Sequence, residues 1–190
     1  MISNFLNLIN YKLFWKLNKK NCNRIKLAVF DVDGVLTNGD LIYGQTKVQR
    51  IFNTKDGLGI KFLQKMQIEV VLISGGSNCG TLERSNDLEI KNALFDVKNK
   101  SEALSKIQKK LGIKAHETIY LGDDLNDLVV KPHVKFLFAT SDASKFLKLK
   151  SDLTLRSKGG SGAVRELSEN LLLANDYFKK ILIKGWIDTN

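Results

Sequence analysis

The chain has little of what usually divides a protein into separate parts or fixes it in a membrane. It contains one proline in 190 residues and no stretch rich in proline or in glycine and serine. We therefore expect one domain with extensions rather than several domains joined by linkers. The sequence has no internal repeat. No apolar run reaches the roughly 18 residues that a membrane span needs, so we expect no transmembrane segment and no signal peptide.

Cysteine and histidine are also scarce. The cysteines are Cys22 and Cys79, and the histidines are His116 and His133. Their spacing matches neither a disulfide framework nor a zinc site, so we expect both thiols to be reduced. Reduced thiols are typical of a cytoplasmic protein, and we expect this location.

Negative charge is in short supply, because 20 acidic residues stand against 30 basic ones and leave a net charge of +10. Such a balance suits nucleic acid, an anionic membrane surface or an anionic small substrate. The lysines are scattered with few aromatic residues between them, so we expect no nucleic-acid partner. A nucleic-acid binder stays open as a third alternative, and it predicts binding that weakens steeply with salt.

Residues 1–24 form a basic N-terminal extension. Apolar residues recur in it at helical spacing with lysines between them, which predicts an amphipathic helix. These apolar residues are Phe5, Leu6, Ile9, Leu13, Phe14 and Leu17. We expect this helix to pack on its own protein or on a sister subunit, and the alternative is a helix that lies on a membrane surface.

Residues 25–190 alternate apolar strands with helices. Strands are expected at 25–30, 68–76, 92–97, 118–124, 134–140 and 153–155, with a hairpin of two short strands around Gly44. Helices are expected at 57–66, 77–88, 100–113 with Gly112 as its C-cap, and 142–148, and a long one follows the glycine-rich turn at 159–162. The alternation predicts an α/β fold with a parallel sheet that is covered by helices on both faces.

Four groups of polar residues follow expected strands, and in a parallel sheet such ends meet at one crevice. They are Asp31 with Asp33, Ser74 with Gly75, the region of Lys100, and Asp123 with Asp124 and Asp127. Carboxylates crowded in this way repel one another unless a divalent cation lies among them. A site of oxygen ligands without histidine or cysteine favours Mg²⁺, which usually shares a phosphate oxygen with the substrate.

The residue types in this crevice suit phosphoryl transfer. Asp31 can attack phosphorus and form an aspartyl phosphate. Asp33 can protonate the leaving oxygen and then activate water, if Gly34 allows the backbone to turn. Ser74 and the backbone N–H groups after it can hold phosphoryl oxygens, while Lys100 can neutralise the developing charge.

The motifs resemble those of a known superfamily. The stretches "DVDGVLT" (31–37), "ISGG" (73–76), "KNK" (98–100) and "GDDLND" (122–127) resemble the four motifs of haloacid dehalogenase (HAD) phosphatases. The stretches "FNTKDGLGIKFL" (52–63) and "GGSGAVRE" (159–166) look like signatures of the 3-deoxy-D-manno-octulosonate 8-phosphate (KDO 8-phosphate) phosphatases. The resemblance runs from about residue 25 to about residue 173 and leaves the N-terminal extension outside.

The resemblance implies a Rossmann-like HAD fold without a large cap domain, and a Mg²⁺-dependent phosphatase of lipopolysaccharide synthesis. It also implies a homotetramer, in which a hairpin at about 37–53 and a C-terminal tail at about 156–190 close the sites of neighbouring subunits. Carried over by position, Asp31 and Asp123 bind the metal with their carboxylates and Asp33 with its backbone carbonyl, while Asp124 and Asp127 support these ligands. The implied contacts of the sugar phosphate are Asp33, Asn53, Thr54, Lys55, Asp56, Gly57, Lys61, Gly75, Arg84 and Lys100.

The sequence departs from the family pattern at Gly76, where the family usually has arginine, and at Lys61, which is often arginine. Arginine grips a carboxylate or phosphate with two parallel hydrogen bonds, which glycine cannot replace. Two alternatives therefore stay open. One is a phosphatase for a nonulosonate (sialic-acid-type) 9-phosphate. The other is a non-catalytic, phosphatase-like partner of a sugar nucleotidyltransferase, although such a scaffold has no need of the intact set of aspartates and lysine.

Overall fold

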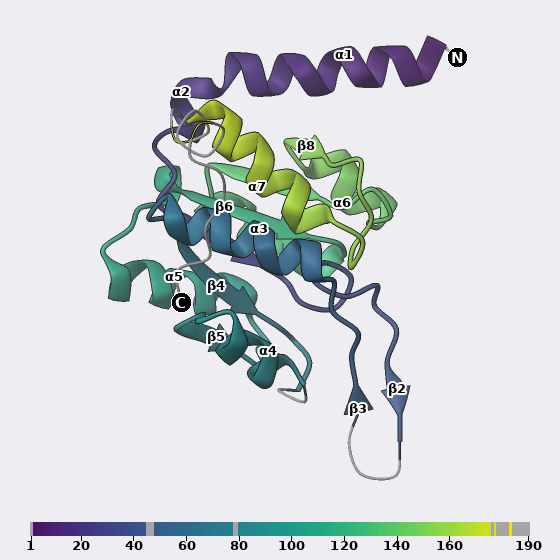
Figure 1. The fold of residues 1–190 in the computed structure, drawn as a ribbon, viewed down its shortest axis with the longest axis vertical. Helices are drawn as coiled ribbons and strands as arrows, with labels where there is room; N and C mark the ends of the chain where they lie inside the picture. Colours follow the sequence, from purple (N-terminus) through teal and green to yellow (C-terminus); the bar gives the residue numbers. More distant parts are fainter. Residues whose placement is uncertain (1, 45–47, 78–79, 176, 178–182, 184–190) are drawn as a thin grey trace.

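A computed structural model describes residues 2–44, 48–77, 80–175, 177 and 183, with residues 2–8 described by their backbone only. Its centre is a sheet of six parallel strands in the order β5-β4-β1-β6-β7-β8 (Figure 1). The strands are β1 (Leu27–Phe30), β4 (Glu69–Ile73), β5 (Asn92–Leu94), β6 (Thr118–Gly122), β7 (Phe136–Ala139) and β8 (Leu153–Thr154). The expected α/β fold with a parallel sheet is confirmed.

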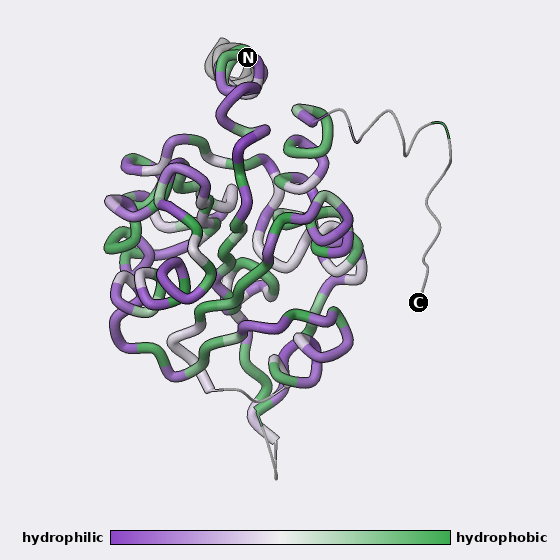
Figure 2. Tube along the Cα trace, turned by 90° about the vertical axis from the view of Figure 1, so that its left-hand side faces the viewer, coloured by the Kyte–Doolittle hydropathy of each residue, from purple (hydrophilic) through white to green (hydrophobic). Residues whose placement is uncertain are grey.

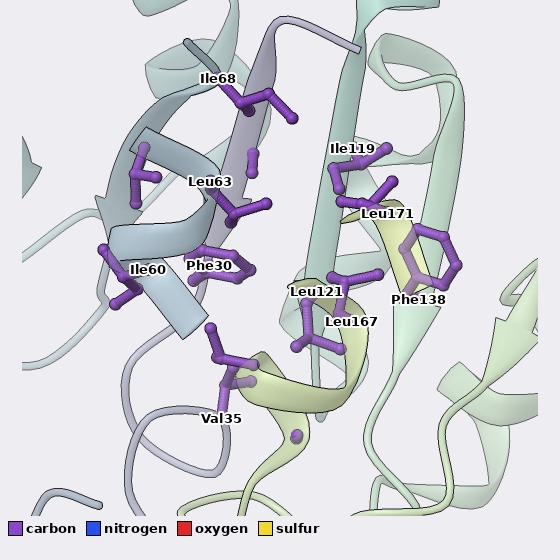
Figure 3. Packing of buried hydrophobic residues seen from close by; sticks show 14 of the residues in the cluster. Phe30, Val35, Ile60, Leu63, Ile68, Ile119, Leu121, Phe138, Leu167 and Leu171 are labelled. Carbon is purple, nitrogen blue, oxygen red and sulfur yellow. The ribbon is translucent and has the colours of Figure 1, made fainter. Parts of the chain in front are cut away.

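Alternate residues of each strand supply two separate hydrophobic clusters, one on each face of the sheet. On one face, Phe30 and Leu121 pack with helices α3 (Thr54–Lys65) and α7 (Ala163–Ala174). Figure 3 shows side chains of α3 and α7 that point toward those of β1 and β6. On the other face, Val29 and Tyr120 belong to the cluster of α5 (Lys100–Leu111), η2 (Leu125–His133) and α6 (Lys145–Lys150). The sheet is thus the middle of three layers, as expected from strands that are apolar throughout.

Helix ends are set by local sequence. The side chains of Asn53 and Asn99 each accept a backbone N–H at the start of α3 and α5. Gly112 ends α5 in the left-handed conformation, with φ at +68°, as the sequence predicts. These caps matter for function, because Asn99 fixes the start of the helix whose first residue is Lys100.

Several expected helix boundaries are wrong, and one element is missed. The helices expected at 57–66 and 142–148 are α3 (Thr54–Lys65) and α6 (Lys145–Lys150). The helix expected at 77–88 is α4 (Thr81–Asp87), preceded by Gly80 in the left-handed conformation. The segment 125–133, for which we expect no element, is a 3₁₀ helix with Pro132 inside it. A 3₁₀ helix has three residues per turn, so the search for a 3.6-residue period misses it.

A hairpin leaves the body of the domain after β1. Its strands β2 (Ile42–Tyr43) and β3 (Val48–Gln49) are antiparallel, as expected around Gly44. The hairpin projects beyond the sheet and its helices in both views (Figures 1 and 2). Several large apolar side chains in and beside it are exposed: Leu41, Ile42, Tyr43 and Ile51.

The N-terminal extension contains helices α1 (Ile2–Leu17) and α2 (Lys19–Cys22). Among the side chains described, α1 contacts the domain through Tyr11, Phe14 and Trp15, and Trp15 stacks on Phe138 with ring centroids 5.6 Å apart. The helix packs on its own protein, one of the two expected arrangements, and of the predicted apolar residues Phe14 takes part, whereas Ile9, Leu13 and Leu17 are exposed in the single subunit. Aromatic rings bury more area per side chain, and they form the contact instead.

In the part of the chain that the structure describes, no helix combines the length and the apolar character needed to cross a membrane.

Candidate active site

The predicted convergence of polar residues is present at the carboxyl ends of the strands. Asp31 follows β1, Ser74 follows β4 and Asp123 follows β6. The N–H of Asp31 still donates to the carbonyl oxygen of Leu121 at 3.1 Å, so the strand pairing of the sheet reaches this carboxylate. The sequence is apolar up to each of these residues, and the buried strand therefore ends where a polar side chain enters the site.

Lys100 links two of the carboxylates. Its Nζ lies 2.7 Å from Oδ2 of Asp31 and 2.7 Å from Oδ1 of Asp127, and its side chain is 3% exposed. Burial alone lowers the pKa of this amine, but Asp127 and Asp31 outweigh burial and raise it. Lys100 is therefore a protonated cation that stands between two buried aspartates.

Asp127 accepts hydrogen bonds from several other groups of the site besides Lys100. Its Oδ1 also accepts the hydroxyl of Tyr120 at 2.7 Å, and its Oδ2 accepts the backbone N–H groups of Asp123 at 2.9 Å and Asp124 at 3.2 Å. Burial and the charge of Asp127 raise the pKa of Tyr120 well above its usual value, so the phenol stays a donor. Tyr120 is missing from our predicted site. The signal was the tyrosine in the middle of a buried strand, because the hydroxyl of a buried tyrosine needs a partner.

Three carboxylates lie close enough to share one ion. Asp31, Asp123 and Asp127 each offer an oxygen within 4.8 Å of the others. Burial, followed by the charge of Asp127, raises the pKa of Asp31 to about 7. Burial, followed by the charge of Asp31, raises the pKa of Asp123 to about 8. Burial and mutual repulsion thus disfavour the ionised carboxylates. A Mg²⁺ ion, which prefers oxygen ligands, would offset this repulsion.

Gly34 brings the turn after Asp33 against Asp123, which follows β6. Its φ is +86°, and a Cβ at this position would lie 2.0 Å from Oδ2 of Asp123. Both the conformation and the space therefore require glycine. The expectation that glycine permits a turn here is confirmed, and its second role, room for Asp123, is visible only in the structure.

Asp33 has a partner that our sequence analysis missed. Arg50 donates from Nε to Oδ1 of Asp33 at 2.7 Å and from Nη2 to Oδ2 at 3.0 Å. The arginine side chain is 2% exposed, whereas that of Asp33 is 29% exposed. From its alternation with Val48 and Phe52 we took Arg50 only as part of the hairpin, and nothing local in the sequence marks it as a residue of the site.

Ser74 is buried at the end of β4. Its Oγ accepts the N–H of Gly76 at 3.0 Å, which fixes the turn and leaves the hydroxyl proton for another acceptor. Gly75 between them is exposed.

The start of α3 separates into exposed and buried residues. Thr54 and Lys55 are exposed, and Asn53 is half-buried and donates from Nδ2 to the carbonyl oxygen of Gly160. Asp56 is 1% exposed, and its carboxylate accepts the N–H groups of Gly162 and Arg165 at the start of α7. The expected sugar contact of Asp56 is therefore corrected, because its oxygens are used to cap α7.

The remaining predicted contacts lie further along the helices. The guanidinium of Arg84 covers Gly57, where a Cβ would lie 2.3 Å from Nη2. Lys61 forms an ion pair with Glu89 at 2.6 Å, and no contact described for it reaches the carboxylates. Asp124 is exposed and caps η2 by accepting the N–H of Leu125 at 2.7 Å.

The glycine segment at 159–162 contacts its own chain. The N–H of Gly160 donates to the carbonyl oxygen of Val35 at 2.9 Å, and a Cβ on Gly159 would lie 1.9 Å from the carbonyl oxygen of Gly34. This part of the expected tail supports the turn after Asp33 of its own subunit. The tail continues as α7, and most of its residues after 175 lie outside the described residues.

Comparison with known proteins gives one family throughout. Residues 94–167 match the model of haloacid dehalogenase-like hydrolases. The chain is 36% identical over 157 residues to the 3-deoxy-D-manno-octulosonate 8-phosphate phosphatase KdsC of Haemophilus influenzae, covering 82% of this chain and 87% of the relative. It is 37% identical over 151 residues to KdsC of Escherichia coli, covering 79% and 80%.

Solved structures agree. The phosphatase of the same name from Yersinia pestis superposes with a TM-score of 0.82 at 33% identity, over 85% of this chain and 88% of that one. The phosphatase from Moraxella catarrhalis, solved with magnesium ion, phosphate ion and KDO, gives a TM-score of 0.83 at 31% identity, over 88% and 97%.

Proposed function

This chain belongs to the haloacid dehalogenase-like hydrolases, in the family of the 3-deoxy-D-manno-octulosonate 8-phosphate phosphatases, and we propose that it hydrolyses this sugar phosphate to KDO and phosphate. The observation that carries the proposal is the buried set of Asp31, Lys100 and Asp127 beside Asp123, because it holds a nucleophile, a cation and oxygen donors for Mg²⁺ at one point. The product is a building block of lipopolysaccharide.

We propose the following roles for the two aspartates after β1. A carboxylate oxygen of Asp31 attacks phosphorus, so that one P–O bond forms while the bond to the sugar oxygen breaks. Asp33 gives its proton to the leaving sugar oxygen. The ionised Asp33 then takes a proton from water, which attacks phosphorus and releases phosphate and free Asp31.

The charge of the phosphoryl group is met from several sides. We assign Lys100 and the hydroxyl of Ser74 to phosphoryl oxygens, with Asp127 holding Lys100 in place. The carboxylates of Asp31 and Asp123 and the backbone carbonyl of Asp33 would hold Mg²⁺, and Asp124 and Asp127 would support them. When bound, the ion neutralises carboxylate and phosphoryl charge. Asp127 is not assigned as a direct ligand, because four donors already occupy its two oxygens.

The sugar-acid end of the substrate is assigned to the exposed start of α3. Asn53, Thr54 and Lys55 present polar groups there, next to the site. Gly75 leaves room for the sugar, Gly57 leaves room for the guanidinium of Arg84, and Arg84 and Lys61 supply positive charge further out. The family motif and the exposure of Thr54 and Lys55 support these roles. Asp56 has no such role, because its carboxylate caps α7.

We also propose how the chain is organised. Residues 1–24 are an extension and residues 25–190 are the phosphatase domain, whose hairpin at 37–53 acts as a flap. The exposed apolar residues of the hairpin support its burial against a neighbour in a homotetramer, together with the end of the tail. A cytoplasmic location is supported by the buried free thiol of Cys22.

The test is Mg²⁺-dependent phosphate release from KDO 8-phosphate, measured beside a nonulosonate 9-phosphate with the full chain. We expect fast release from the first substrate and loss of release when EDTA removes the metal. Fast release from the second substrate alone would keep the chemistry and replace the substrate. No release from either, with metal bound, would overturn the proposal in favour of the scaffold.

A further inference from the structure

We propose that Arg50 is a substrate-binding residue of this site, and that its guanidinium, seated over Gly76 beside Asp33 and Ser74, binds oxygens of the substrate's phosphoryl group. The inference rests on the proposed phosphatase function and adds a residue to it.

The position of the guanidinium is unusual for a hairpin residue. Arg50 directly follows β3 of a hairpin that projects from the domain (Figure 1), yet its side chain is 2% exposed. Two parallel hydrogen bonds to Asp33 hold it in one orientation. A buried and oriented cation has lost its water before substrate arrives, which makes its interaction with an anion stronger.

Gly76 provides the space for this arrangement. A Cβ on Gly76 would lie 2.8 Å from Nη2 of Arg50, 2.8 Å from Oδ2 of Asp33 and 3.4 Å from Oγ of Ser74. Gly76 has no positive φ, so its backbone does not require glycine. The requirement comes from the three polar groups that converge on this point.

The same convergence indicates the ligand. Asp33 is assigned to the leaving oxygen and Ser74 to another phosphoryl oxygen, so a group beside both lies at the phosphoryl end of the substrate. A planar guanidinium matches two phosphate oxygens, as it now matches two carboxylate oxygens. Lys100 already forms ion pairs with Asp31 and Asp127. The further negative charge of a bound phosphate therefore needs a second cation in the site.

The test compares Arg50→Ala, Arg50→Lys, Gly76→Ala and the double variant with the unmodified full chain in Mg²⁺. Each is assayed with KDO 8-phosphate and with p-nitrophenyl phosphate, which carries a phosphoryl group but no sugar acid. Inhibition by inorganic phosphate is measured as well. Lys106→Gln is the control, because it removes one positive charge from an exposed position.

For Arg50→Ala we expect KM for both substrates and the inhibition constant of phosphate to rise about 10-fold or more, as for the loss of a charged hydrogen bond. Arg50→Lys should recover part of this loss, because it restores charge without the planar fork. Gly76→Ala should raise the same constants when Arg50 is present and by less in Arg50→Ala, where one of the two groups at 2.8 Å is absent and Asp33 is no longer held in place by it.

Three results would overturn the proposal. The first is KM and phosphate inhibition unchanged in Arg50→Ala while kcat falls, which would show that Arg50 only positions Asp33. The second is a KM effect confined to the sugar acid, which would place Arg50 at its carboxylate. The third is a Gly76→Ala effect of equal size with and without Arg50.

Thermal unfolding checks that each variant is folded. If Arg50→Ala does not fold, the comparison of Arg50→Lys and Gly76→Ala with the unmodified chain decides the question, and unchanged constants in both would contradict it. If the unmodified chain acts on p-nitrophenyl phosphate but not on KDO 8-phosphate, the proposed substrate fails. The role of Arg50 in phosphate binding is then tested by KM for p-nitrophenyl phosphate and by phosphate inhibition alone.

Discussion

The hydroxyl of Tyr11 donates to Oε1 of Glu166 at 2.6 Å and joins residues that lie 155 positions apart in the chain. Glu166 also accepts the backbone N–H groups of Arg156 and Ser157 at the start of the glycine segment. The guanidinium of Arg156 lies 4.0 Å above the ring of Tyr11. The N-terminal extension is thus tied to the segment that supports the turn after Asp33.

Tyr11→Phe should lower the free energy of unfolding by about 1–2 kcal/mol, because the hydroxyl donates to Glu166 and accepts from Nδ2 of Asn170, and each hydrogen bond contributes about 1 kcal/mol. The ring remains and keeps its packing, so the loss reports the hydroxyl alone. Urea unfolding of both proteins measures it. Lys106→Gln, at a side chain that is 74% exposed, is the control and should change the free energy of unfolding by less than about 0.5 kcal/mol. Equal stability of Tyr11→Phe and the unmodified chain would show that these bonds do not secure the extension.

Asp31→Asn should reduce phosphate release by roughly 10³-fold or more, since an amide cannot replace the attacking carboxylate. The fold should remain intact, because the amide oxygen can still accept one of the two donors, the N–H of Val32 or the Nζ of Lys100, and Lys100 keeps Asp127 as a partner. Steady-state release and thermal unfolding are measured on the same preparation. Substantial turnover in a folded Asp31→Asn protein would exclude attack by this residue.

Lys100→Met should destabilise the metal-free protein by about 3–5 kcal/mol, because it leaves Asp31 and Asp127 buried without their cation. The methionine side chain fills a similar space, so the change reports charge more than packing. Urea unfolding in EDTA measures the effect. Lys106→Met, at a position 74% exposed, should stay within 0.5 kcal/mol of the unmodified chain. A similar small change for both variants would mean that the carboxylates are neutral in the folded protein.

The strands and the carboxylates were predictable because each depends on neighbours in sequence. An apolar run followed by aspartate indicates both a buried strand and its end, as in Leu27–Phe30 before Asp31. The same reasoning gave the cap at Gly112, since glycine there relieves a left-handed backbone. Family resemblance then supplied the roles of the residues.

The partners of these carboxylates could not be predicted in the same way. Arg50 reaches Asp33 across 17 positions and Tyr120 reaches Asp127 through the interior, so the pairing depends on tertiary packing. Asp56 shows the opposite error. Its motif suggests a ligand contact, but the fold turns its carboxylate toward the start of α7. Sequence identifies a polar residue, whereas only packing decides which donor it meets.

The raised pKa values of Asp31 and Asp123 predict how stability depends on pH. Free aspartate has a pKa near 4, while the folded protein holds these protons up to about 7 and about 8. A proton held more tightly in the folded state stabilises it at low pH, and this contribution is lost as pH rises through the folded values. The metal-free protein should therefore become less stable between about pH 4 and pH 8.

Mg²⁺ should reverse this trend, because it binds the ionised oxygens that repel one another without it. We expect the increase in Tm on adding Mg²⁺ to be larger at pH 8.5 than at pH 5.5. Thermal unfolding in EDTA and in excess Mg²⁺ across this range measures both effects. In Asp123→Asn one of the two titrating carboxylates is gone, so both the fall of Tm with pH and the gain from Mg²⁺ should be smaller. A Tm that rises with pH in EDTA, or a gain from Mg²⁺ that is equal at both pH values, would show that these carboxylates ionise without strain and that the ion is held elsewhere.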